Sequence, residues 1–229
     1  MTEAVLFDVD GTLIDSNDAH ARAWVAALAE AGYDVPFERI RPLIGQGGDR
    51  ILPAVAGLSD EEGPGKRIAA RRGEIFKERE LGGIGPQPGA KALLEAVRAR
   101  GARVVIATSA KSDELDGLLA RADLNALVDV ATTSDDAGSS KPAPDIVHSA
   151  LKKAGLAPEA AVFVGDTKWD VEAAHNAGVA CVALRCGGMD PASLAGAEAV
   201  YSDPAEVLGA LGRPPFDWGR APKAASTAA

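Results

Sequence analysis

The sequence has few of the features that mark membrane or secreted proteins. Its 229 residues include two cysteines, and aromatic residues account for 4% of the chain. No stretch approaches the roughly 18 uncharged apolar residues that a transmembrane helix needs. Glu3 and Asp8 interrupt the N-terminus before any long apolar run, which excludes a typical secretory signal. We therefore expect a cytoplasmic protein that does not act at a membrane.

Positive charge is also scarce. The chain has 24 Lys and Arg residues against 33 Asp and Glu residues, which gives a formal net charge of −9 at pH 7. This balance argues against a nucleic acid as the main partner, because nucleic acids are polyanions. A small anionic ligand is still possible, since one buried lysine and a metal can create a local positive site. Cys181 and Cys186 are expected to be reduced and structural.

What remains is the composition of an ordinary globular protein. Hydrophobic residues make up 47% of the chain and charged residues 25%, both typical values. A chain of this size can bury a core without the help of a disulfide or a metal. At about 150 residues per domain, the length favours one domain with a sizeable insert.

Short apolar runs recur along the chain and are continuous rather than alternating in polarity. Such runs are typical of strands that are covered on both faces. Helical patterns that end at a glycine separate several of these runs, for example 90–100 and 145–154. This alternation predicts an α/β fold with a doubly wound parallel sheet over residues 85–212. The predicted strands are 4–7, 103–107, 128–131, 161–164 and 180–184.

Residues 16–84 do not follow this alternation of strands and helices, because helical patterns follow one another there without a good strand among them. The patterns cover 19–31, 37–43, 48–55 and 60–81. We expect residues 1–15 and 85–212 to form the sheet domain and residues 16–84 to form a smaller, all-helical domain. Residues 213–229 are rich in Ala, Ser, Pro and Lys and are expected to be a flexible tail.

An acidic motif, Asp8-Val9-Asp10-Gly11-Thr12, follows the first predicted strand directly. The carboxyl ends of strands in an open α/β sheet are where ligands bind. Two carboxylates this close repel each other, and a divalent cation would remove the repulsion; oxygen-only ligands suit Mg²⁺. The simpler alternative for this motif alone is a solvated acidic turn.

Further polar groups follow the later strands. Thr108 and Ser109 come after the second predicted strand, and Lys141 comes after the third. Asp166 follows the fourth, with Asp170 one helical turn later. Each group is ordinary by itself, but together they place hydroxyl, cation and acid at one edge of the sheet. This combination predicts a site for an anionic ligand.

In order and spacing, these motifs resemble those of the haloacid dehalogenase-like hydrolase superfamily. The resemblance covers residues 4–211 and rests on Asp8 to Thr12, Thr108, Lys141, and Gly165 with Asp166 and Asp170. It implies a Rossmann-like core, with the helical insert as a small cap of the phosphoglycolate phosphatase and β-phosphoglucomutase type. His20 lies close to Asp15 and Ser16, where that subgroup has its hinge into the cap.

The resemblance implies a Mg²⁺-dependent phosphatase that acts on a small phosphorylated metabolite. Asp8 would be the nucleophile that forms an aspartyl-phosphate, and Asp10 the general acid and base. The phosphoryl oxygens would be bound by Thr108, Ser109 and Lys141.

The resemblance also implies the metal ligands. Mg²⁺ would be held by Asp8, Asp166 and Asp10, the last through its backbone carbonyl. Asp170 is expected outside this ligand set, where it would hold either a metal-bound water or Lys141.

Two alternatives stay open at this point. A phosphosugar mutase of the β-phosphoglucomutase type needs cap groups for a second phosphate, commonly an arginine in the first cap loop. Here that loop, 45–50, is rich in glycine and ends at Arg50. The other alternative is a non-catalytic protein that binds a phosphorylated ligand, although none of the motif carboxylates is lost. The physiological substrate and the oligomeric state are left open by the sequence.

A few conspicuous residues receive structural interpretations. Trp24 is expected in the core of the cap, with the substrate cleft as the alternative position. Arg71 and Arg72 are expected to form a solvated helix face.

Overall fold

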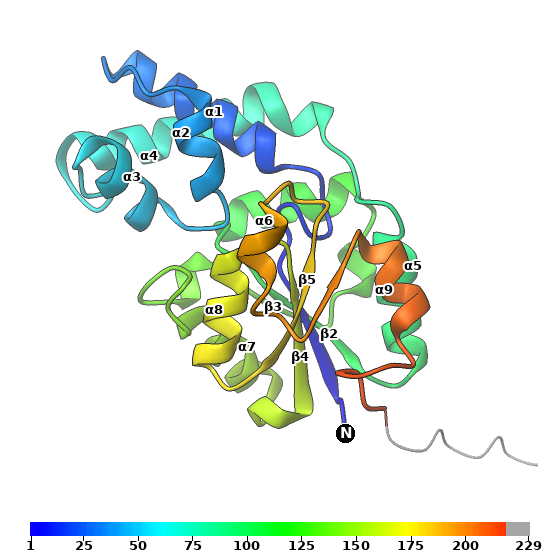
Figure 1. Ribbon diagram of the computed structural model, residues 1–229. Helices are drawn as coiled ribbons and strands as arrows, with labels where there is room; N and C mark the ends of the chain where they lie inside the picture. The colour runs from blue at the N-terminus through cyan, green and yellow to red at the C-terminus, as the bar shows by residue number, and fades with distance from the viewer. Residues whose placement is uncertain (219–229) are drawn as a thin grey trace, which may run out of the picture.

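The computed structural model describes residues 1–218, and a parallel sheet forms its centre (Figure 1). The strand order is β3-β2-β1-β4-β5-β6, and every neighbouring pair is parallel. This is the order of a doubly wound sheet whose direction of winding reverses at β1, so the predicted fold class is confirmed. The strands are β1 (Ala4–Phe7), β2 (Arg103–Ala107), β3 (Val130–Thr132), β4 (Ala161–Gly165), β5 (Ala180–Leu184) and β6 (Ala199–Tyr201).

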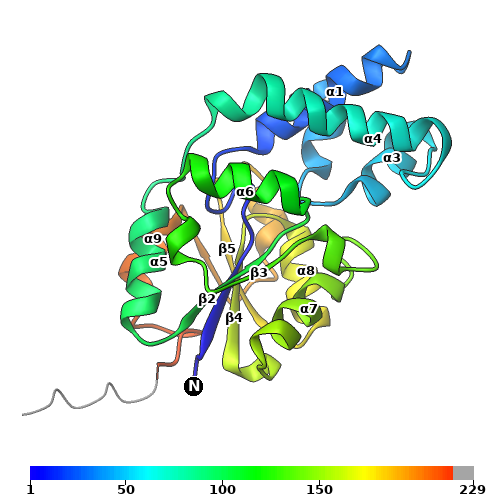
Figure 2. The same ribbon diagram turned by 180° about the vertical axis from the view of Figure 1, so that it is seen from behind.

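Continuous apolar runs form the inner strands because both faces of the sheet are covered. All four residues of β1 are buried, and Val5 lies in register with Val104 of β2 and Val162 of β4. One face packs against α5 (Ala90–Ala99), α6 (Ser112–Arg121) and α9 (Pro204–Ala210). The opposite face packs against α7 (Asp145–Ala154) and α8 (Lys168–Asn176) (Figures 1 and 2).

The edges of the sheet differ from the sequence-based expectation. Strand β3 covers residues 130–132 rather than 128–131, and β6 was not predicted. Strand β6 is only three residues long and its Val200 is 37% exposed. It therefore lacks the apolar run that identified the inner strands.

The insert is helical throughout, as predicted. Its helices, called the cap helices below, are α1 (Asn17–Glu30), α2 (Phe37–Ile40), α3 (Gly48–Ala56) and α4 (Gly63–Ile75). Helix α4 continues as a π-helical segment (Phe76–Glu80) and a 3₁₀ turn (Leu81–Gly83). Both views show the cap helices beyond the carboxyl ends of the strands (Figures 1 and 2). The division into a sheet domain and a cap domain at residues 16–84 remains our proposal.

The segment after α9 packs against the sheet domain. Phe216 is 4% exposed and stacks on Trp218, whose indole N–H donates to the carbonyl oxygen of Leu211. Phe216 and Trp218 of the predicted tail are therefore packed, Arg213, Pro214 and Asp217 are exposed, and 219–229 lie outside the described residues. Within residues 1–218, no helix is long and apolar enough to cross a membrane. The cytoplasmic location stays a prediction.

Candidate functional site

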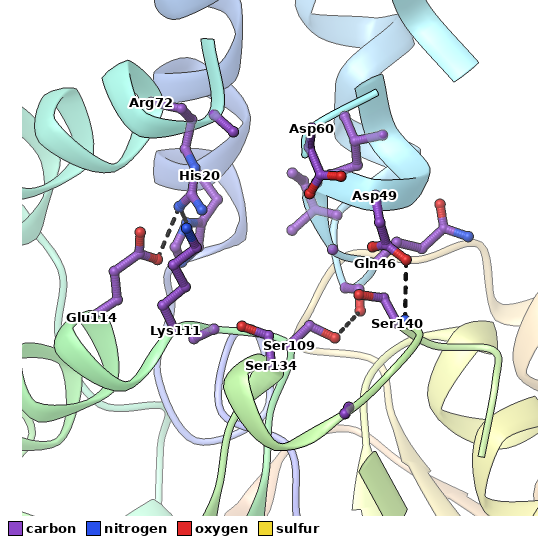
Figure 3. Close-up of a pocket in the computed structure, with 18 of the residues that line it drawn as sticks. His20, Gln46, Asp49, Asp60, Arg72, Ser109, Lys111, Glu114, Ser134 and Ser140 are labelled. Atoms are coloured by element: carbon purple, nitrogen blue, oxygen red, sulfur yellow. Dashed lines mark hydrogen bonds and ion pairs between the residues drawn. The ribbon is translucent and has the colours of Figure 1, made fainter. Parts of the chain in front are cut away.

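A cavity of about 390 Å³ lies between the cap helices and the carboxyl ends of the strands (Figure 3). Asp8 and Asp10 line it directly after β1, the strand at which the winding of the sheet reverses. Ser109 lines it after β2. The crevice at such a reversal point is where open α/β sheets bind ligands.

The turn after β1 depends on a glycine. Gly11 has a φ of +80°, a left-handed conformation that favours glycine. A side chain at this position would overlap with the side chains of Asp166 and Asn17. The glycine thus lets the chain of the first motif pass close to the carboxylate that follows β4.

Lys141 is completely buried between two carboxylates and is not among the residues that line the cavity. Its Nζ donates to Asp8 Oδ1 and to Asp170 Oδ1, each at 2.6 Å. Burial lowers the pKa of Lys141, but the charges of Asp170 and Asp8 outweigh it and hold the pKa above its usual value. The second oxygen of Asp170 accepts from the backbone amide and the hydroxyl of Thr167, which caps α8. Of its two predicted roles, Asp170 performs the contact with Lys141.

Asp166 belongs to a group of three buried carboxylates. Asp8, Asp166 and Asp170 each offer an oxygen, and these atoms lie within 4.8 Å of one another. Asp166 accepts hydrogen bonds from Thr12 Oγ1 at 2.9 Å and from Asn17 Nδ2 at 2.8 Å. Burial and the charge of Asp170 nevertheless raise the pKa of Asp166 to about 7. The positive charge near the three carboxylates is therefore too small to balance their negative charge.

The surroundings of Asp8 also disfavour its ionised form. Burial raises its pKa well above the ordinary value; Lys141 opposes this, and the neighbouring carboxylates add to it. Its Oδ2 atom is buried and has no hydrogen-bond partner within residues 1–218. An unpartnered buried carboxylate oxygen is costly, and Asp8 is one of the residues that line the cavity.

The side chain of Asp10 is not part of this group. Its Oδ1 atom accepts from Ser16 Oγ at 2.5 Å and contacts His20 Nε2 at 2.7 Å. Burial raises the pKa of Asp10, but the charge of His20, the hydrogen bonds from His20 and Ser16, and the charge of Arg72 lower it below its ordinary value. Asp8 and Asp10 therefore experience opposite environments although they are two residues apart.

A buried ion pair connects the cap to the sheet domain beside Asp10. Arg72 of α4 donates from Nη1 to Glu114 Oε2 of α6 at 2.9 Å, and the same nitrogen lies 3.4 Å from His20 Nδ1. Its guanidinium also lies over the ring of Trp24. The Arg72 and Glu114 side chains are only 13% and 3% exposed. The expectation of a solvated face is wrong for Arg72, because α4 turns this residue toward α6.

Of the other predicted residues, Ser109 and Trp24 line the cavity and Thr108 does not. Thr108 is buried, and its hydroxyl accepts from the backbone amide of Ala110. Ser109 Oγ donates to the carbonyl oxygen of Gly45 in the cap at 3.1 Å. Trp24 is nearly buried and also lines the cavity, so both positions considered for it apply.

Sequence reasoning missed several residues of the cavity wall. Asp49, Asp60, Lys111 and Glu114 line it (Figure 3). Asp49 and Asp60 belong to the cap and follow no strand, Glu114 lies in α6, and Lys111 lies in the loop between β2 and α6. Only in the glycine-rich loop 45–50 could the local sequence have indicated charged residues of the cavity wall. That loop was noted, but Asp49 in it was not singled out.

Comparisons with known proteins agree with these motifs. A family model described as "Haloacid dehalogenase-like hydrolase" matches residues 5–184. A phosphoglycolate phosphatase from Pseudomonas savastanoi pv. phaseolicola is 31% identical over 194 residues, which is 82% of this chain and 71% of that protein. The Arabidopsis thaliana protein SUPPRESSOR OF QUENCHING 1, chloroplastic, is 33% identical over 187 residues. This match spans 80% of the chain but 18% of the plant protein.

Solved structures give the same picture. A hydrolase from Pseudomonas syringae superimposes with a TM-score of 0.86 at 32% identity, and the match covers 93% of this chain and 98% of that one. CbbY from Rhodobacter sphaeroides, solved in complex with phosphate, gives a TM-score of 0.77 at 27% identity, with 90% and 96% coverage.

Proposed function

The chain belongs to the haloacid dehalogenase-like hydrolases, and from this premise we propose that it hydrolyses a small phosphomonoester, with Mg²⁺, through an aspartyl-phosphate. The observation that carries the proposal is Asp8. Asp8 lines the cavity, one of its oxygens accepts from Lys141, and the other is buried and has no hydrogen-bond partner within residues 1–218. A carboxylate held in this way is ready to attack an electrophile that enters the cavity.

The carboxylate group fits a divalent cation. Its oxygens are the hard ligands that Mg²⁺ prefers, and the raised pKa of Asp166 reflects a local excess of negative charge. Asp8, Asp166 and the backbone carbonyl of Asp10 would hold the ion. Asp170 would stay outside, because Lys141 and Thr167 occupy its oxygens. When bound, the ion neutralises carboxylates, so that an anionic phosphate can approach.

The remaining roles follow from position and charge. A carboxylate oxygen of Asp8 forms a bond to phosphorus while the bond from phosphorus to the leaving oxygen breaks. Asp10 supplies a proton to that oxygen and later removes one from the water that releases phosphate. Three residues would bind phosphoryl oxygens, where charge develops during transfer: Thr108, Ser109 through its amide, and Lys141.

The first cap loop favours a phosphatase over a mutase. Its single arginine, Arg50, is 46% exposed and lies near Asp49. It is not among the residues that line the cavity. The loop therefore presents no cation that would hold a second phosphate inside. A purely ligand-binding role is less well supported, because the Asp8, Asp10 and Asp166 carboxylates are all present.

The direct test is turnover of p-nitrophenyl phosphate. We expect hydrolysis with added Mg²⁺ and its loss when EDTA removes the ion, with recovery when Mg²⁺ is returned. The aryl leaving group needs few specific contacts with the cap, so the test does not depend on the physiological substrate. Hydrolysis that persists in EDTA would contradict the metal requirement.

The pKa of Asp166 leads to a prediction about stability. A carboxyl whose pKa is raised to about 7 on folding binds more protons in the folded than in the unfolded chain between its two pKa values. The metal-free protein should therefore lose stability as pH rises from about 4 to about 7. Asp166→Asn should weaken this dependence, because the substituted amide does not ionise, while the raised pKa of Asp8 still contributes to it.

Thermal unfolding in EDTA and in Mg²⁺ measures both effects. We expect Mg²⁺ to raise the melting temperature of the wild type at pH 8 by roughly 4 °C or more, and to change that of Asp166→Asn much less. Asn17 keeps the carbonyl oxygen of Gly187 as an acceptor in the variant. A wild type without EDTA-sensitive stability at pH 8 would argue against the carboxylate group as the metal site.

A further inference from the structure

A residue at the start of the cap reaches a carboxylate that follows β4. Asn17 is the first residue of α1 and is 1% exposed. Its Nδ2 atom donates to Asp166 Oδ2 at 2.8 Å and to the carbonyl oxygen of Gly187 at 3.0 Å. Asp166 is one of the residues proposed above to hold Mg²⁺. A cap residue is therefore in direct contact with a proposed metal ligand.

Hydrogen bonds hold both oxygens of the Asp166 carboxylate. Oδ1 accepts from Thr12 Oγ1 at 2.9 Å, and Asn17 is the one side chain within residues 1–218 that donates to Oδ2. Two such bonds fix the plane of the carboxylate. Carboxylates that bind a metal are commonly held in this way, and the loss of one partner typically lowers metal affinity by about 10- to 100-fold.

Two glycines make room for the contact between Asn17 and Asp166. A Cβ at Gly11 would overlap with Asn17 Nδ2 and with Asp166 Oδ2, and a Cβ at Gly187 would overlap with the same carboxylate oxygen. Either side chain would occupy the position where the amide meets the carboxylate. The backbone on both sides therefore permits this contact because it is glycine.

The other end of the Asn17 amide has no partner. Asp166 Oδ2 and the carbonyl oxygen of Gly187 are both acceptors, so the NH₂ group must face them. Oδ1 is then left buried, with no hydrogen-bond partner within residues 1–218. An unpaired buried acceptor is costly, and an amide with a purely structural role would have both ends paired. Since Mg²⁺ usually keeps several waters in a protein site, the ion would bring a donor for this oxygen.

A second cap residue holds the same loop in a different way. Arg41 donates from Nη2 to the carbonyl oxygen of Gly187 and from Nε to Asp18 Oδ1, each at 2.5 Å. Within residues 1–218, Arg41 forms no hydrogen bond or ion pair with Asp166. The attachment of the cap to Gly187 therefore does not depend on Asn17 alone. What Asn17 adds is the contact with the carboxylate.

We propose that Asn17 is a positioning residue for the metal. Its NH₂ group fixes Asp166 as a ligand, and its Oδ1 accepts a hydrogen bond from a water that the ion retains. The cap thus contributes to metal binding, although the proposed ligands Asp8, Asp10 and Asp166 all lie outside residues 16–84. This inference rests on the proposed Mg²⁺-dependent function.

Calorimetric titration of the metal-free protein with Mg²⁺ tests the proposal without a measurement of turnover. We expect Asn17→Ala to raise the Kd for Mg²⁺ by about 10- to 100-fold. Arg41→Met removes the other cap bond to Gly187, and it should not weaken Mg²⁺ binding, because it also removes a positive charge from the neighbourhood. Asn125→Ala removes an exposed amide outside the cavity and should leave the Kd unchanged.

Asn17→Asp gives a second measurement, which does not depend on the folding of the alanine variant. It keeps the shape of the side chain but places a carboxylate, without a donor, against Asp166. The metal-free variant should therefore melt at a lower temperature than the wild type, and Mg²⁺ should raise its melting temperature by more than that of the wild type.

The two variants have outcomes that would contradict the proposal. An unchanged Kd in folded Asn17→Ala, or the same Mg²⁺-induced shift in the wild type and Asn17→Asp, would overturn the role of Asn17. A wild type that neither binds Mg²⁺ nor hydrolyses p-nitrophenyl phosphate would instead overturn the proposed function.

Discussion

Asp8→Asn is expected to lower turnover by about 10⁴-fold or more, the scale of loss when an enzyme nucleophile is removed. The amide has nearly the shape of the carboxylate but does not attack phosphorus effectively. Folding should survive, because Lys141 keeps Asp170 as a partner when Asp8 loses its charge. The substitution also removes one carboxylate from a group that burial already destabilises. The melting temperature of the metal-free variant should therefore equal or exceed that of the wild type.

The measurement combines steady-state hydrolysis of p-nitrophenyl phosphate with thermal unfolding of the same preparation. Asp34→Asn serves as the control, since it removes one exposed carboxylate from the cap. Loss of activity together with retained stability assigns the chemistry to Asp8. Activity close to that of the wild type would exclude Asp8 as the nucleophile.

The position of Asp8 was predictable because its surroundings follow from strand order. Asp8, Lys141 and Asp166 each follow a strand, and parallel strands end at one edge of the sheet. The apolar runs that identified those strands exist because helices cover both faces. At this edge of the sheet, the local sequence pattern is therefore sufficient to predict which residues lie together in the fold.

The surroundings of Asp10, unlike those of Asp8, were not predictable from strand order. It depends on His20 and Arg72 in the cap and on Glu114 in α6, which are far apart in the sequence. No local period records that α4 packs toward α6, so Arg72 had the pattern of a solvated helix face. Contacts between the cap helices and the sheet domain are tertiary, and they determine both the environment of Asp10 and the wall of the cavity.

The hydrogen bonds and charges around Asp10 affect when it can act as an acid and when it can act as a base. Its lowered pKa favours the ionised form in the ligand-free arrangement, which suits a base in the second step. To donate a proton in the first step, Asp10 must be protonated. The negative charge of a bound phosphoryl group beside it raises its pKa in the required direction. The proton of Asp10 is therefore linked to substrate binding.

Asp10→Asn separates this proton from the shape of the side chain. The amide oxygen still accepts from Ser16 and His20, whose bonds hold the carboxylate now, and the backbone carbonyl is unchanged. We expect formation of the aspartyl-phosphate from an alkyl phosphate to fall by about 10²–10⁴-fold, the usual contribution of general acid catalysis. From p-nitrophenyl phosphate it should fall far less, because nitrophenolate leaves without a proton.

A rapid-quench, single-turnover comparison of the two substrates on this variant resolves the roles of Asp10. Hydrolysis of the aspartyl-phosphate should slow equally for both substrates, since the same intermediate then needs a base to activate water. The first step should differ between them only through the leaving group. Equal losses in the first step would mean that Asp10 serves the metal or the fold. In that case the bonds from Ser16 and His20 would be structural, and the proton would have to come from another group at the cavity.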